Sequence, residues 1–163
     1  MRTLAILVVL LAVSGSARAD NRPQISVAIA SSHDESPGDR AAAERDANRE
    51  TIRQALLAEL KASPQLTTIA QPGIEARRVD LSIVALTATE TEHGVELETE
   101  LKIVISDASG RILSILTGGA HCEVARHTSA ARLRTFEKQL LDDAMRGMFG
   151  PLRAHLLHSV ASC

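Results

Sequence analysis

The sequence predicts an α+β domain with one mostly antiparallel sheet and two helices packed on one face of that sheet. Three observations lead to this prediction. Apolar and polar residues alternate through three long segments between residues 79 and 124, and the connections between them are short and contain glycine. An amphipathic helical pattern precedes these segments, and a second, longer one follows them. The elements therefore come in the order β-α-β-β-β-β, with a long helix at the C-terminus.

The chain begins with the pattern of a cleavable secretory signal peptide. A charged start at Met1–Thr3 precedes the apolar run 4–13, and the small-residue motif Ala17-Arg18-Ala19 follows. Ten residues would span only about 15 Å as a helix, against about 30 Å of hydrocarbon in a bilayer, so we interpret the segment as a leader and not as an anchor. We expect residues 1–19 to be removed. Residues 20–163 should then form a single exported domain, periplasmic or secreted, without an integral membrane segment.

A strand and a polar loop are expected after the leader. In residues 24–31 the large apolar side chains Ile25, Val27 and Ile29 recur with a period of two, which is typical of a strand. The following segment is polar and contains Pro37-Gly38, which indicates a loop. A long polar loop directly after a strand is a candidate binding loop. The residues assigned to this candidate loop are Ser32, His33, Asp34, Glu35 and Asp39.

The first helix should carry its apolar residues toward the sheet. Apolar side chains recur at helical spacing from Ile52 to Leu60, with charged residues between them. Asn48 is the expected N-cap, because its side-chain oxygen can accept a free backbone N–H of the first turn. Alternatively, the helix begins earlier, near Asp39, since alanines follow that residue and favour helix. Pro64 ends the helix, and a short strand over residues 66–69 comes next.

Residues 79–91, 95–106 and 111–124 are expected to form three consecutive antiparallel strands. The connections between them are His93-Gly94 and Asp107–Gly110, which are short enough for hairpins. In the middle strand the apolar side chains share one face, and the charged side chains share the other, which indicates a buried face and a solvent-facing one. The charged residues of the solvent-facing side are Glu96, Glu98, Glu100 and Lys102.

Residues 129–160 are predicted to form the last helix, with a kink or break at Gly150-Pro151. This geometry bears on the two cysteines, Cys122 and Cys163, which could pair in an oxidising compartment. One straight helix of about 45 Å would hold them apart, whereas a break would bring the chain back. The sequence therefore leaves two alternatives open: a disulfide between Cys122 and Cys163, or two free or intermolecular thiols.

The composition argues against nucleic acid as a partner. The formal net charge of −2 becomes more negative when the leader removes Arg2 and Arg18, whereas binding to a phosphate backbone or to anionic lipids needs clustered positive charge. The chain also has no Trp, no Tyr and only two Phe. Because base stacking and sugar recognition use aromatic faces, we expect neither kind of ligand.

The sequence contains no motif that predicts a cofactor. It has no nucleophile-elbow pattern, and Gly118-Gly119 is a pair of glycines without a phosphate-loop pattern after it. His121, Cys122 and His127 lie close together and, with a carboxylate, could bind zinc. On a strand, however, the adjacent His121 and Cys122 would point to opposite faces. We therefore expect no cofactor, and we keep a small exported hydrolase or metal-dependent enzyme using His121 and His127 as the alternative function.

Three stretches of the chain resemble the periplasmic domain shared by penicillin-binding-protein activators, curli-secretion-channel proteins and the N-terminal region of TolB. The stretches are ISVAIAS, QALLAELKASPQLTTI, and RVDLSIVALTATE together with LKIVISDASGRILSI. Asp80 takes the place of an aspartate that opens a strand in that family, and Asp107–Leu113 takes the place of a hairpin. The resemblance implies an envelope accessory or scaffolding domain without catalysis, and it carries over no functional residue.

Export, an α/β pattern and the lack of a catalytic motif together predict a non-enzymatic accessory or scaffolding domain that binds a protein partner in the cell envelope. The natural docking element is an exposed edge strand, to which a partner can add a strand of its own. An oligomerising envelope component is a further alternative. The partner itself is not identifiable from the sequence.

Overall fold

The computed structural model describes residues 24–158. The elements in chain order are β1 (Ile25–Asp34), α1 (Ala42–Ala62), β2 (Leu66–Thr67), β3 (Glu75–Glu90), β4 (Gly94–Asp107), β5 (Ile112–Ala125) and α2 (Ala130–His158). The predicted α+β class, the order of the elements and the long C-terminal helix are confirmed. The expected leader, residues 1–19, lies outside the described residues.

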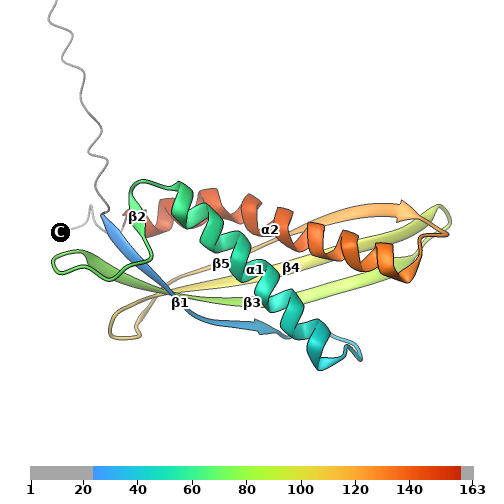
Figure 1. The fold of residues 1–163 in the computed structure, drawn as a ribbon, viewed down its shortest axis with the longest axis horizontal. Helices are drawn as coiled ribbons and strands as arrows, with labels where there is room; N and C mark the ends of the chain where they lie inside the picture. Colours follow the sequence, from blue (N-terminus) through green and yellow to red (C-terminus); the bar gives the residue numbers. More distant parts are fainter. Residues whose placement is uncertain (1–23, 159–163) are drawn as a thin grey trace, which may run out of the picture.

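The five strands form one sheet in the order β2-β1-β3-β4-β5, and this sheet is mixed (Figure 1). β4 runs antiparallel to both β3 and β5, as predicted. β1, however, runs parallel to both β2 and β3, so the expectation of a mostly antiparallel sheet is wrong on this side. The cause is α1, which carries the chain back to the end of the sheet where β1 began, and a strand that follows such a crossover is parallel to the first.

Both helices lie across the sheet, with α1 over β1 to β3 and α2 over β4 and β5 (Figure 1). One apolar cluster joins the two helices to the strands. Its fully buried members include Leu56 and Leu60 of α1, Ile83 and Ile103 of the central strands, and Leu141 of α2. Burial of each such side chain stabilises the fold by roughly 1.5–3 kcal/mol. On the outer face of β4, Glu96, Glu98 and Glu100 are exposed.

α1 begins at Ala42, so the prediction that Asn48 caps this helix is wrong. The alternative start near Asp39 is closer to the observed one. The N-cap position belongs to Ala41, which forms no side-chain capping hydrogen bond. Asn48 is buried inside the helix, and its amide donates to the side chain of Asp34. The partner of Asn48 comes from another element, which the local pattern does not reveal.

α2 continues without interruption through Pro151, so the expected break at Gly150-Pro151 is absent. Proline usually opposes a helix because its ring clashes with the side chain of the preceding residue and with the carbonyl one turn earlier. Here the preceding residue is Gly150, which has no side chain. The residue one turn earlier is Gly147, which is exposed and unconstrained by neighbouring side chains.

The strands next to α1 differ in length from the prediction. β1 continues to Asp34 and β3 begins at Glu75, because the two strands pair in parallel from Ile25↔Glu75 to Asp34↔Ile83. β2 is limited to Leu66–Thr67 and pairs only with the start of β1. The residues added at the end of β1 and at the start of β3 are mostly polar and show no alternation. They belong to strands because they pair with the neighbouring strand, which the sequence pattern alone does not reveal.

Asp107 organises the turn between β4 and β5. Its Oδ1 accepts hydrogen bonds from the Ser109 hydroxyl (2.6 Å) and from the backbone N–H groups of Ser109 (2.9 Å) and Arg111 (3.0 Å). Arg111 Nε donates to Oδ2 at 3.1 Å. The hydrogen bond from the Ser109 hydroxyl contributes most, and together these donors lower the pKa of Asp107 to about 2.

Replacement of Asp107 by asparagine should therefore remove a stabilising contribution that depends on pH. The folded pKa of about 2 lies below the ordinary value of 3.8, so the contribution is present in full above the ordinary pKa and is lost as the pH falls toward 2. Urea titrations of the wild type and of Asp107→Asn across this interval measure the difference in free energy of unfolding. That difference should shrink toward zero with falling pH, and a difference that stays constant would contradict the assignment.

Candidate functional site

The candidate binding loop is divided between a strand and a true loop. Ser32, His33 and Asp34 belong to the end of β1, and Glu35 and Asp39 lie in the connection to α1. His33, Glu35 and Asp39 are exposed, whereas Ser32 is half-buried. The side chain of Asp34 is 0% exposed. The loop therefore presents three of its five predicted residues to solvent, and their role in binding stays a prediction.

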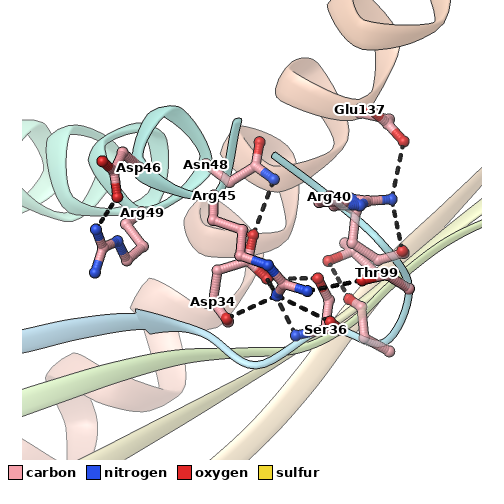
Figure 2. Close-up of polar contacts among 12 residues, drawn as sticks. Asp34, Ser36, Arg40, Arg45, Asp46, Asn48, Arg49, Thr99 and Glu137 are labelled. Atoms are coloured by element: carbon pink, nitrogen blue, oxygen red, sulfur yellow. Dashed lines mark hydrogen bonds and ion pairs between the residues drawn. The ribbon is translucent and has the colours of Figure 1, made fainter. Parts of the chain in front are cut away.

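Asp34 is the centre of a buried polar network at this end of the sheet (Figure 2). Its Oδ1 accepts hydrogen bonds from the Ser36 backbone N–H (3.1 Å), from the Ser36 hydroxyl and, at 3.5 Å, from Arg45 Nη1. Its Oδ2 accepts a hydrogen bond from Asn48 Nδ2 at 3.0 Å. Both oxygens are thus occupied by the protein itself, and Asp34 stabilises the loop and does not face a ligand.

Arg45 of α1 completes this network by binding the backbone of the loop. Its guanidinium donates to the carbonyl oxygens of Asp34 (3.0 Å), Ser36 (3.0 Å) and Gly38 (2.8 Å). Gly38 has a φ of 101°, in the region that favours glycine, so the loop turns there at low cost. Because one planar, rigid guanidinium binds three carbonyl groups of the loop, it fixes the path of the loop next to α1.

Arg40 ties the same loop to β3 and to α2 (Figure 2). Its Nη2 donates to the carbonyl oxygen of Leu86 at 2.8 Å and to Glu137 Oε1 at 3.3 Å. Burial raises the pKa of Glu137, because the neighbouring Arg40 compensates only in part for the loss of water. The loop is therefore a junction between the two helices and the sheet. Sequence patterns missed this junction, since its partners are far apart in the chain.

His121, Cys122 and His127 do not form a common site. His121 is exposed on the outer face of the sheet, and Cys122 is half-buried on the opposite face, where it packs against the apolar cluster that includes Leu97 of β4 and Leu140 of α2. His127 is exposed in the turn after β5. Within residues 24–158, no three His, Cys, Asp or Glu side chains are grouped so that they could hold a metal ion. No observation on this part of the chain favours the alternative of an enzyme that uses His121 and His127.

The predicted pairing of Cys122 with Cys163 involves a residue outside the described part of the chain. The path of α2 nevertheless bears on it, because the helix begins beside Cys122 and runs away from it. From Leu140, a member of the buried cluster against which Cys122 packs, the helix advances about 27 Å before His158. The five residues after His158 can extend at most about 18 Å. A disulfide needs Cα atoms about 6 Å apart, so of the two alternatives we predict free or intermolecular thiols.

We accordingly expect the oxidised protein to contain no disulfide between Cys122 and Cys163 of the same chain. Burial, and to a smaller extent Asp143, raise the pKa of the Cys122 thiol, so this thiol should also react slowly in the folded protein at neutral pH. Thiol titration of the unreduced protein in denaturant, combined with its intact mass, measures the pairing. A monomer with no free thiol would contradict the expectation.

β5 forms one edge of the sheet. It is 14 residues long, and β4 is its sole neighbour in the described sheet. Edge strands are commonly protected from further pairing by proline, by lysine or by being very short. β5 has none of these protections, and Ile112 and Ile115 are 58% and 57% exposed. The strand therefore offers a long row of free backbone groups beside apolar side chains.

Gly118 and Gly119 create a hollow on each face of the sheet in the middle of β5. The hollow on the helix side has a volume of about 300 Å³, and the hollow on the outer side has a volume of about 320 Å³. The helix-side hollow is lined mainly by Leu116, Gly118, Ala144, Gly147, Met148 and Pro151. The outer hollow is lined mainly by Glu98, Glu100, Thr117, Gly119 and His121.

The two glycines are needed for different reasons. A Cβ atom on Gly118 would lie 3.0 Å from Met148 Cγ, at the flexible end of a side chain of α2. A Cβ atom on Gly119 would overlap the carbonyl oxygen of Thr99 on β4. A glycine inside a strand often marks such a close approach of another backbone, and this is the signal by which the sequence could have indicated the site.

Comparison with protein-family models and with curated protein sequences finds no match. Among solved structures, protein XCC0632 from Xanthomonas campestris, of family DUF330, is 12% identical over 86% of this chain and 89% of its own, with a TM-score of 0.57. The hypothetical protein CT253 from Chlamydia trachomatis is 12% identical over 83% of this chain and 99% of its own, with a TM-score of 0.54. A minor lipoprotein from Acinetobacter baumannii is 15% identical over 79% and 93%, with a TM-score of 0.46.

At this level of identity the likeness to XCC0632 and CT253 shows a shared fold. Neither of these two structures is described as a penicillin-binding-protein activator, a curli-secretion protein or TolB, so the resemblance seen in the sequence stays a prediction. Neither described helix has a stretch long and apolar enough to cross a membrane.

Proposed function

We propose that the chain is an exported, non-enzymatic accessory domain that binds a protein of the cell envelope through the free edge of β5. The observation that carries this proposal is the length of unpaired and unprotected backbone along β5. A partner strand that added to this edge after the irregularity near Ile112 would form a ladder of backbone hydrogen bonds with β5 and would lie beside Ile115. Export to the periplasm or the medium is supported by the leader pattern at the N-terminus.

The rest of the molecule supports a binding role in two ways. The polar network around Asp34 and Arg45 is used to hold a loop, and both oxygens of the Asp34 carboxylate are occupied by the protein itself. The sheet is stiffened from one side by two helices, and a rigid edge loses little conformational freedom when a partner binds. A preformed edge on a rigid scaffold is therefore well suited to strand addition.

Site-specific photocrosslinking in cells tests the proposal. A photoreactive amino acid replaces Ile115, which lies on β5 and is 57% exposed, and in a matched control it replaces Ile69, which is 68% exposed near β2. We expect one discrete adduct with an envelope protein from position 115 and none from position 69. Equal adducts from both positions, or no adduct from position 115, would overturn the proposal. An adduct with a second copy of the chain would instead identify an oligomerising component.

A further inference from the structure

We infer that the edge of β5 and the two hollows at Gly118 and Gly119 form a recognition groove for an extended segment that alternates apolar and basic residues. This inference rests on the proposed function and adds the chemistry of the partner. It starts from the geometry of strands, in which consecutive side chains point to opposite faces of a sheet. A segment paired with the middle of β5 would place one side chain toward the helix-side hollow and the next toward the outer hollow.

The helix-side hollow fits an apolar side chain. Its walls are Leu116 of β5 and Ala144, Met148 and Pro151 of α2. Gly147 also lines the hollow and is exposed, so the hollow is open at the surface beside β5. About 300 Å³ is enough space for a side chain such as valine, leucine or methionine. Removal of that side chain from water would favour binding in proportion to its apolar area.

The outer hollow fits a basic side chain. Glu98 and Glu100 line it and are exposed, and neither forms an ion pair with any residue between 24 and 158. Glu96 and Glu123 follow toward the β3–β4 hairpin as a cross-strand pair, and both are exposed. Lys102 follows Glu100 on the same face of β4, so its positive charge lies beyond Glu100 as seen from Glu98. A lysine or arginine in the outer hollow would thus meet the carboxylates of Glu98 and Glu100, whereas a glutamate would meet like charges.

The probe is a capped peptide with an N-terminal Trp-Gly followed by four Val-Lys repeats, and its counterpart has Val-Glu repeats. Because the chain has no Trp and no Tyr, Trp fluorescence anisotropy reports the peptide alone. We expect saturable binding of the Val-Lys peptide to the mature chain at low salt, and binding about tenfold or more weaker for the Val-Glu peptide. Binding of the Val-Lys peptide should weaken as salt is added.

Two variants locate the binding site. Gly147→Leu fills the helix-side hollow from α2, where a Cβ atom has no neighbour within 4 Å, and we expect it to weaken binding of the Val-Lys peptide at least about tenfold. Ala131→Leu is the matched control, because Ala131 lies on the same helix, is exposed and does not line the hollow. Affinity should be unchanged in this control. Circular dichroism is used to check that both variants fold.

The second variant, Glu98→Gln with Glu100→Gln, should abolish the preference for Val-Lys over Val-Glu, and Glu50→Gln on the exposed side of α1 should leave it intact. Equal binding of the two peptides to the wild type, or full affinity of Gly147→Leu, would overturn the inference. The outcome is separable from that of the proposed function. A crosslink from position 115 to a segment without apolar–basic alternation would leave docking on β5 standing and refute only the preference.

Discussion

Replacement of Asp34 by alanine is expected to lower the free energy of unfolding by about 3 kcal/mol. The substitution removes an acceptor that is fully buried, and it leaves the Asn48 amide and the Ser36 donors without that acceptor, while Arg45 keeps its three backbone carbonyls. The cost of donors that lose their partner in a dry site exceeds the net value of the hydrogen bonds themselves. In a domain of this size the melting temperature should fall by roughly 10 °C.

The matched control for this experiment is Asp46→Ala. Asp46 pairs with Arg49 on the surface of α1, where the two side chains are 63% and 40% exposed. Such exposed pairs stabilise a protein by at most about 1 kcal/mol. Urea denaturation followed by circular dichroism gives both values. If the two variants lose the same stability, the network around Asp34 does not hold the loop as described.

Gly119→Ala is expected to cost about 2 kcal/mol of stability, because its methyl group would overlap the carbonyl oxygen of Thr99. The overlap involves backbone, so β4 and β5 must move apart at the centre of their pairing. Gly118→Ala should cost less, since the atom that it meets is the flexible side chain of Met148. Thermal denaturation of the two variants compares these effects directly.

A third glycine serves as the control for conformational freedom. Gly147→Ala meets no atom within 4 Å and lies within α2, so it should raise stability by up to about 1 kcal/mol. From the most to the least stable, the expected order is therefore Gly147→Ala, wild type, Gly118→Ala and Gly119→Ala. An unchanged stability of Gly119→Ala would show that β4 and β5 are not in close backbone contact at this point.

The elements that could be predicted are those whose signal is local. Alternation along β4 and the glycine-containing connections on either side of it determine the antiparallel strands, because period and turn chemistry depend only on neighbouring residues. The direction of β1 could not be obtained this way, since the same alternation suits parallel and antiparallel neighbours. Its parallel pairing with β3 depends on where α1 returns the chain.

The functional features were hidden for a related reason. Asn48 has the side chain of a helix cap, and its role in binding Asp34 depends on a strand that lies 14 residues earlier. Gly118 and Gly119 were visible as two glycines inside a strand pattern, and only the position of α2 shows that they open two hollows. Pro151 led to the opposite error, because it predicted a break that the structure does not have. A proline usually ends a helix, but here it is accommodated next to Gly150.

Backbone amide hydrogen exchange, measured residue by residue by NMR with and without excess Val-Lys peptide, tests the central claim most directly. If the peptide adds to β5, amide groups within Ile112–Ala125 that exchange freely in the free protein become protected, while those of α1 and β2 keep their rates. Protection confined to α1, or exchange in β5 that is unaffected by a saturating peptide, would contradict the account.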